Sequence, residues 1–145
     1  MRKGAAVAVA CVAVVLVSVF FISACGSSSD KDEIAQTVQM YLAALANGDG
    51  AKACDQLTGQ QARAVFEGMV LQLPELRATS CADALSKLSG SLGADEKAAL
   101  GGAETTNVRV DGDSATAELV GGTKTVDLVN ADGRWLISGG LSLTP

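Results

Sequence analysis

The sequence has no histidine among its 145 residues, and only 3% of them are aromatic. The lack of histidine excludes a Ser–His or Cys–His catalytic triad. The scarcity of aromatic side chains excludes the stacking platforms on which proteins hold single-stranded nucleic acid. We therefore expect neither a triad enzyme nor a nucleic-acid partner.

Acidic residues are missing from the first 25 positions, although the chain has 16 of them. This segment has a positive start at residues 1–3, an apolar stretch at 5–22 and two small residues at 23–24. The order is typical of a secretory signal peptide, which we predict for residues 1–24. Its removal leaves 9 of the 11 basic residues against all 16 acidic ones, a net charge of −7. That charge repels nucleic acid and anionic lipid headgroups.

A cysteine, Cys25, follows the leader directly. Ile22-Ser23-Ala24-Cys25 resembles the lipobox of bacterial lipoproteins, which implies cleavage before Cys25 and attachment of a diacylglycerol anchor to its thiol. The alternative is an uncleaved membrane helix, because about 18 apolar residues just suffice to span a bilayer. Both interpretations place the rest of the chain on the extracytoplasmic face of the cell membrane. We predict the lipidated cysteine and a flexible polar tether at residues 25–30, and a single domain at 31–145.

The first two-thirds of the mature chain have the apolar spacing of helices. Between Asp32 and Ala46, apolar residues recur at intervals of three and four, as on one face of an amphipathic helix. Polar caps and Gly or Pro breaks delimit the later helices. The expected helical segments are 32–46, 49–57, 58–73 and 80–90, with a further turn or two at 94–100.

After Gly101-Gly102 the apolar period changes to two, which is typical of strands. Four strands are expected, at 106–110, 115–119, 123–130 and 134–137, with glycine-containing turns between them. The predicted fold class is therefore α+β, with three to four N-terminal helices packed on one face of a curved four-stranded antiparallel meander.

Two cysteines, Cys54 and Cys81, remain once the leader and the anchor are removed. An even number of cysteines in an oxidising compartment predicts a disulfide bond. A redox or metal-binding pair is the alternative, but the wide separation, the absence of a CxxC motif and the lack of histidine disfavour it. We predict a structural disulfide.

The first helix carries a family resemblance. Val38-Gln39-Met40-Tyr41-Leu42-Ala43-Ala44-Leu45, followed by Gly48-Asp49, resembles the first helix of the nuclear transport factor 2-like superfamily, which includes ketosteroid isomerase. The meander ending in Gly133-Arg134-Trp135-Leu136-Ile137 is similar as well, so the resemblance covers residues 31–138. It implies a cone-shaped domain with a cavity between helices and sheet, but no particular activity, since this fold hosts many.

The resemblance gives one catalytic hypothesis. Tyr41 falls on the position at which ketosteroid isomerase-like proteins place an oxyanion donor. That chemistry also needs an aspartate base, and the matching region offers only Glu67. Asp127, a candidate second donor, alternates with apolar neighbours and is expected to face solvent. The competing interpretation, which we favour, packs the Tyr41 ring in the core with its hydroxyl at the rim.

We predict no catalytic residue, no metal ligand and no cofactor. Asp111, Asp113 and Asp132 lie at glycine-containing turns, where aspartate serves local hydrogen bonds. The residues that could line a pocket are Tyr41, Phe66, Met69 and Trp135.

The function expected from the sequence is that of a membrane-anchored, non-catalytic lipoprotein. Its domain would bind an apolar small molecule or an envelope protein partner. The alternative is an isomerase or dehydratase centred on Tyr41.

Overall fold

The computed structural model of the protein describes residues 27–120 and 124–141. The predicted signal peptide at 1–24 and the predicted lipid site at Cys25 lie outside the described residues. Within them, none of the helices has the length and apolar character needed to cross a membrane.

Five α-helices and one 3-10 turn precede four strands in the described part of the chain. The α+β class is confirmed, with more helices than the three to four expected, because the turn or two predicted near residue 94 is a helix of eight residues. The helices are α1 (Ser28–Ala46), α2 (Gly50–Cys54), α3 (Gly59–Gln72), the 3-10 turn η1 (Pro74–Leu76), α4 (Cys81–Ser91) and α5 (Ala94–Gly101). The strands are β1 (Thr105–Asp111), β2 (Ser114–Leu119), β3 (Thr125–Ala131) and β4 (Arg134–Gly139).

Helix α1 begins earlier than the apolar spacing predicts. Ser27 is its N-cap, and the Ser27 hydroxyl accepts a hydrogen bond from the Asp30 amide at 3.3 Å. In return, the Asp30 carboxylate accepts from the Ser27 amide at 2.9 Å. This capping box pairs two amides that would otherwise lack partners at the helix start. Residues 28–30, expected to belong to a flexible tether, therefore form the first turn of α1.

The strands form one antiparallel sheet in the order β1-β2-β3-β4, in which each strand pairs with its neighbour in sequence. The predicted meander is thus present. Its apolar side chains alternate along each strand and turn toward α1, as a half-buried sheet requires. The buried set from the sheet is Ala115, Ala117, Val126, Leu128, Trp135 and Ile137.

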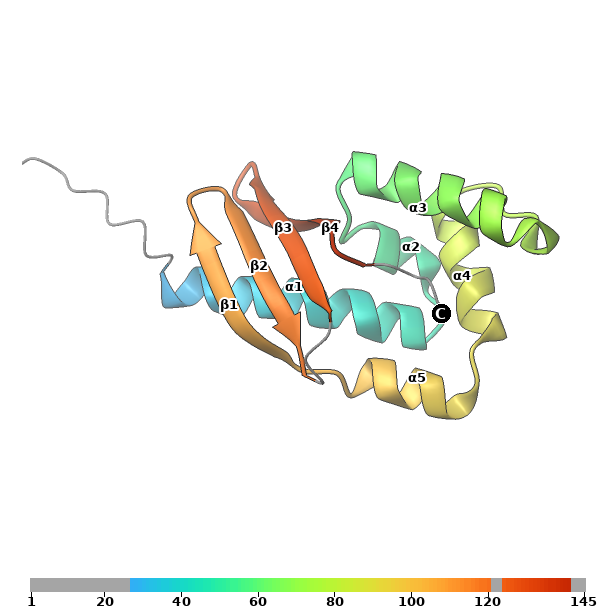
Figure 1. The fold of residues 1–145 in the computed structure, drawn as a ribbon, viewed down its shortest axis with the longest axis horizontal. Coiled ribbons are helices and arrows are strands. Elements are labelled where there is room, and N and C mark those ends of the chain that lie inside the picture. Colours follow the sequence, from blue (N-terminus) through green and yellow to red (C-terminus); the bar gives the residue numbers. More distant parts are fainter. Residues whose placement is uncertain (1–26, 121–123, 142–145) are drawn as a thin grey trace, which may run out of the picture.

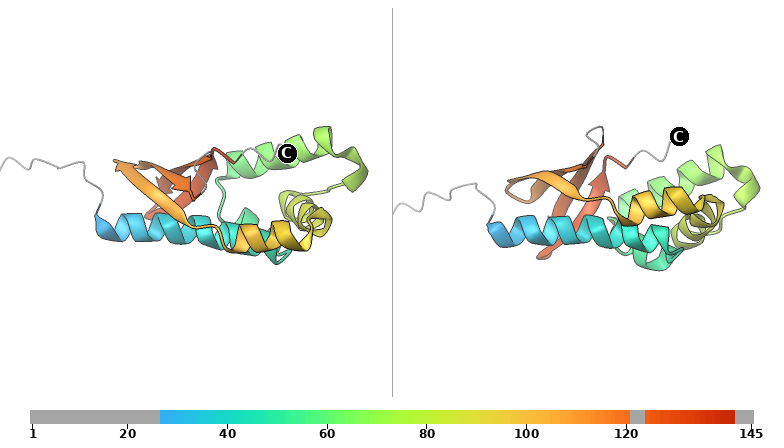
Figure 2. Two further views of the ribbon diagram at one scale, coloured as in Figure 1. Left: turned by 60° about the horizontal axis from the view of Figure 1, so that its bottom comes forward. Right: turned by 90° about the horizontal axis from the view of Figure 1, so that it is seen from below.

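Helix α1 lies along the sheet and contacts β1, β2 and β4, whereas α2 to α5 gather toward its C-terminal half (Figure 1). The two views of Figure 2 show the same division, with the sheet over the N-terminal half of α1. Helices α2 and α5 pack on α1, and α3 reaches both α4 and β4. The expected arrangement, with several helices covering one face of the sheet, is therefore corrected: α1 provides most of the cover, and the other helices extend the core beyond the sheet.

The segment between α2 and α3 connects these outer helices to the sheet, because its backbone forms hydrogen bonds with β4. The Ile137 amide donates to the Gln56 carbonyl at 2.8 Å, and the Thr58 amide donates to the Ile137 carbonyl at 2.8 Å. A parallel bridge at Leu57 results. The outer edge of β4 is therefore partly occupied by its own chain.

Helices α2 and α4 meet at very short range. The Cys54 and Cys81 sulfurs lie at bonding distance, with their Cα atoms 6.2 Å apart, in agreement with the predicted disulfide. Nearby, the Ser86 hydroxyl accepts from the Gly50 amide at 3.1 Å and donates to the Gly48 carbonyl at 3.1 Å. The bond and these contacts hold α2 and α4 together.

Candidate functional site

The interior between α1 and β4 holds the two largest fully buried side chains of the described residues. Tyr41 comes from α1 and Trp135 from β4, and their side chains are 1% and 2% exposed. Thr37, one helical turn before Tyr41, donates its hydroxyl to the Trp135 carbonyl at 3.3 Å. This hydrogen bond ties the middle of α1 to β4 at the level of the two aromatic residues.

The polar atoms of both aromatic residues are unpaired. Neither the Tyr41 hydroxyl nor the Trp135 Nε1 has a hydrogen-bond partner among the described residues. The sequence-based expectation that the Tyr41 hydroxyl reaches the rim of the core is therefore wrong, because the hydroxyl itself is buried. The Ser89 hydroxyl is the third buried side-chain group without a partner among the described residues. An unpaired buried polar group typically lowers stability by about 1–3 kcal/mol, so such groups call for a physical explanation.

Burial also shifts the pKa of Tyr41. Loss of solvation raises the pKa of its phenol from 10.0 to about 12, because the phenolate is disfavoured in an apolar interior. At neutral pH the residue is a neutral hydroxyl that can donate a hydrogen bond.

The other predicted pocket residues lie on α3. Met69 is buried, Phe66 is half-buried, and both pack with the same core as Tyr41 and Trp135. The structure therefore brings the four residues into one apolar core, with Phe66 at its edge. Whether they line a ligand cavity remains a prediction.

The catalytic alternative lacks its base. Glu67 and Asp127 are both exposed, and the register of β3 places Asp127 between the buried Val126 and Leu128 on the opposite face. The polar or charged residues buried in the described chain are Thr37, Gln56 and Ser89, none of which is a carboxylic acid. No carboxylate of the described residues therefore shares the core with the Tyr41 hydroxyl, which an isomerase or dehydratase mechanism would require.

The three aspartates lie at the turns expected for them, and their local hydrogen bonding stays a prediction; at the β3–β4 turn it is the Asn130 Oδ1 that accepts from the Gly133 amide, at 2.9 Å. Asp111 and Asp113 flank Gly112 in the β1–β2 turn, and Asp132 has a φ of 55° before Gly133 in the β3–β4 turn. Among the described residues, no group of three or more Asp, Glu, Cys or His side chains is arranged to hold a metal ion.

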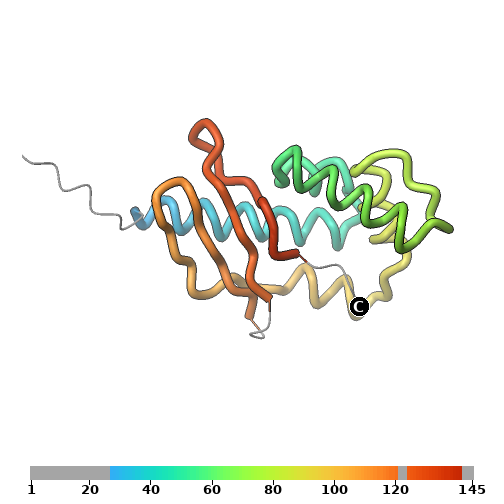
Figure 3. The backbone as a smooth tube through the Cα atoms, turned by 45° about the horizontal axis from the view of Figure 1, so that its top comes forward, coloured from blue at the N-terminus to red at the C-terminus, as the bar shows by residue number. Residues whose placement is uncertain are grey.

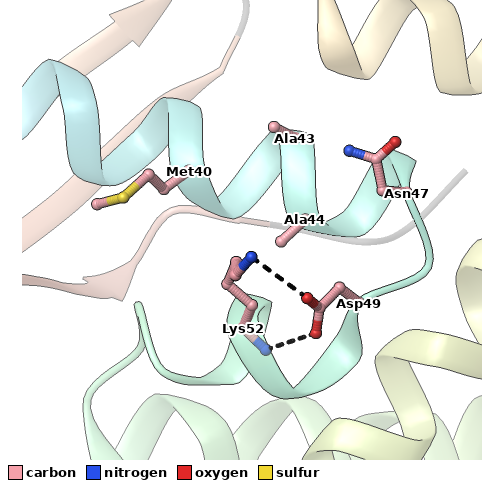
Figure 4. A pocket seen from close by; sticks show the side chains of 6 residues that line it. All are labelled: Met40, Ala43, Ala44, Asn47, Asp49 and Lys52. Atoms are coloured by element: carbon pink, nitrogen blue, oxygen red, sulfur yellow. Dashed lines mark hydrogen bonds and ion pairs between the residues drawn. The ribbon is translucent and has the colours of Figure 1, made fainter.

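A surface pocket of about 200 Å³ lies between α1 and α2, and it was not among the predicted sites. Figure 4 shows its lining, in which α1 contributes a stripe and α2 a polar rim. The stripe repeats at i, i+3, i+4 and i+7, which puts its members on one helix face. This spacing can be read from the sequence, but the sequence does not tell that α2 packs beside this face of α1. The lining residues are Met40, Ala43, Ala44, Asn47, Asp49 and Lys52.

The rim of this pocket is polar and its floor is apolar. Lys52 and Asp49 form an exposed ion pair at 3.5 Å, of a kind that contributes little to stability. Met40 is 40% exposed, so its thioether and the alanine methyls offer contact to a single apolar group. The pocket can hold one such group but offers no catalytic arrangement.

Comparisons of the chain with family models, with curated proteins and with solved structures found no match.

Proposed function

We propose that the protein is a lipid-anchored lipoprotein of the extracytoplasmic face, whose domain of the nuclear transport factor 2-like kind binds an apolar small molecule without catalysis. The observation that carries the binding role is the pair of unpaired donors, the Tyr41 hydroxyl and the Trp135 Nε1, buried on facing elements. The anchor is supported by the leader sequence and by Cys25 at its end.

The chemistry of the ligand follows from the donors and their surroundings. The core around them is apolar, so a charged molecule would lose its hydration without compensation. A neutral molecule with an acceptor oxygen would pair one or both donors and bury its apolar remainder against residues such as Met69 and Ile137. The Tyr41 hydroxyl is protonated in the neutral range, as in any tyrosine, and is therefore available as a donor to such a ligand.

The test is native mass spectrometry of the mature domain purified from its own host membrane. We expect a reproducible added mass on the wild-type protein and its loss in a Tyr41→Phe, Trp135→Phe double variant, which removes both donors and keeps most of the ring volume. Met40→Ala is the matched control because it changes the surface pocket and leaves the core donors intact. Retention of the added mass in the double variant would refute the proposed site, and its loss in Met40→Ala would move the ligand to the surface pocket.

A protein partner is the second candidate, and exposed apolar side chains on α3 favour it. Leu71 is 81% exposed and Val70 is 42% exposed, which is unusual for adjacent aliphatic residues on one helix. A wild-type domain without any added mass would favour this role over the small-molecule role. Crosslinking in intact cells would then be expected to capture an envelope protein through residues of α3.

The anchor has its own test. The mature protein is expected to begin with a Cys25 that carries the mass of diacylglycerol, and Cys25→Ala is expected to leave the leader uncleaved or the chain free of lipid. A mature chain that retains residues 1–24 would instead support the membrane-helix alternative.

A further inference from the structure

The two edge strands of the sheet are irregular, whereas the central pair is not. Strands β2 and β3 pair without any shift of register. Strand β1 has one residue too many between Thr106, which pairs with Glu118, and Arg109, which pairs with Thr116. Strand β4 likewise has Ser138 without a partner on β3. Each edge strand therefore carries a β-bulge, and the β2–β3 ladder carries none.

The bulge of β1 is built around an asparagine. Asn107 and Val108 together lie opposite a single residue of β2, Ala117. Val108 packs against the hydrophobic core, whereas Asn107 is exposed. Asn107 has a φ of 50°, in the left-handed region that asparagine tolerates better than most residues. Its side-chain amide donates to the Glu118 carboxylate at 2.7 Å, so Asn107 is the inserted residue and its bond to β2 holds the bulge in place.

The two edges of the sheet differ in what lies beside them. The β4 edge is occupied at Ile137, whose backbone amide and carbonyl bond to the segment between α2 and α3. Strand β1 is the last strand on the other side, and Figures 1 and 3 show no strand beyond it. Its outward backbone groups bond to no other described residue. Such an open edge is a template on which another chain can add a strand.

The bulge interrupts that template. An added strand needs backbone N–H and C=O groups at regular spacing. The inserted Asn107 breaks this spacing in the middle of β1, so a second strand can match residues 105–106 or residues 109–111 but not both. A bulge also increases the local twist and bends the edge away from a flat partner. The β1 edge therefore offers only two short pairing segments.

We infer that the Asn107 bulge prevents the open β1 edge from pairing with a second copy of this chain, and that removal of this one residue would produce a β1-paired dimer. Without Asn107, β1 would alternate regularly, with Val108 and Val110 turned toward the core. Antiparallel pairing of two copies about Val110 would then place Arg109 of each opposite Asp111 of the other, a favourable cross-strand pair. The inference uses neither the proposed ligand nor the proposed anchor.

The test measures the mass in solution of the chain 25–145, which contains every described residue, by light scattering. The concentration is about 0.1 mM, within the range in which exposed strand edges associate. All variants carry Cys25→Ser, so that no free thiol can join two copies. We expect the otherwise unchanged chain to be a monomer and the deletion of Asn107 to double its mass. A folded deletion variant that stays monomeric would overturn the inference.

Two controls separate the bulge from other effects. Asn107→Gly keeps the inserted residue and accepts the positive φ, so it should remain a monomer. Deletion of Ser138 removes the bulge of β4, whose edge is already occupied at Ile137, and should also leave a monomer. Dimers of both controls would show that association does not depend on the open β1 edge, and would contradict the proposal.

Amide hydrogen exchange locates the contact and decides the case in which the deletion variant does not fold. In the dimer, exchange at residues 108–111 should slow several-fold relative to the monomer, while the occupied β4 edge should be unchanged. In the chain that retains Asn107, exchange at these positions should stay constant over about a hundredfold range of concentration below 1 mM. Exchange that slows there as the concentration rises would mean that the bulged edge pairs after all, and would refute its protective role.

Discussion

Replacement of Gly50 by alanine is expected to be strongly destabilising, because this glycine marks the closest approach of α2 to α4. A Cβ atom at Gly50 would fall far inside the van der Waals radius of the Ala82 carbonyl oxygen, 2.5 Å from the Ser86 Oγ and 2.7 Å from the Ser86 amide nitrogen. Two of these three atoms belong to the backbone of α4, so a side-chain rotation cannot relieve the clash. The helices would have to move apart against the Cys54–Cys81 bond.

The expected magnitude combines two terms. Overpacking of this kind lowers stability by about 1–3 kcal/mol. Separation of the helices also breaks the hydrogen bonds of the Ser86 hydroxyl to Gly50 and Gly48, each worth about 1 kcal/mol. The Gly50→Ala variant should therefore lose about 3–5 kcal/mol of unfolding free energy.

Urea denaturation of the mature domain, followed by circular dichroism, measures this loss as a shift in midpoint at constant slope. The matched control is Gly68→Ala, within α3, where an added Cβ meets nothing within 4 Å. Because alanine is the better helix former, the control should gain about 0.5–1 kcal/mol. A Gly50→Ala variant within about 0.5 kcal/mol of the wild type, a margin typical of harmless surface changes, would refute the close packing of α2 on α4.

Three further changes test the Cys54–Cys81 disulfide, the burial of Tyr41 and the N-cap of α1. The Cys54→Ser, Cys81→Ser variant should lose about 3.5 kcal/mol of unfolding free energy in the chain-entropy model, because the two cysteines are 27 positions apart in the sequence. The wild-type mature domain, denatured without reduction, should show no free thiol. Tyr41 is the only tyrosine of the chain, so the rise in phenolate absorbance reports it directly and should occur near its raised pKa of about 12. The pKa of Tyr41 is higher in the folded protein than the unfolded value of 10.0, so ionisation of the phenol favours the unfolded state. The free energy of unfolding should therefore be unaffected by Tyr41 below pH 10 and should fall by about 2–3 kcal/mol as the pH rises from 10 to 12. Tyr41→Phe should abolish this dependence. The Ser27→Ala variant removes the N-cap side chain of α1 and should lose about 1 kcal/mol of unfolding free energy.

Each of these outcomes has a clear opposite. Two titratable thiols in the unreduced domain would contradict the disulfide. A phenolate transition near 10 in the folded protein would place the Tyr41 hydroxyl in water. An unchanged stability of Ser27→Ala, with Ser28→Ala as the neighbouring control, would contradict the position of the cap.

The sequence by itself determined the class of fold, the sheet and the disulfide, because these depend on local periodicity or on a count. Alternation along β2, β3 and β4 decided which side chains turn inward, and Asp127 faces solvent as its place between Val126 and Leu128 predicted. The cysteines had only one pairing open to them once the leader and the anchor were set aside.

Only the tertiary structure decided where the helices lie and what surrounds Tyr41. Helix periodicity predicted an inward face for α1, but the tie between Thr37 and β4, which places Tyr41 wholly inside the core, depends on residues 98 positions apart. The close approach at Gly50 requires α4 to lie across α2, and the pocket beside Met40 requires α2 to fold back along α1. The start of α1 was missed for a related reason: several serines could cap the helix, and the choice of Ser27 rests on the reciprocal geometry with Asp30. Local pattern fixes which face of an element is apolar, but contacts between distant segments fix what that face meets.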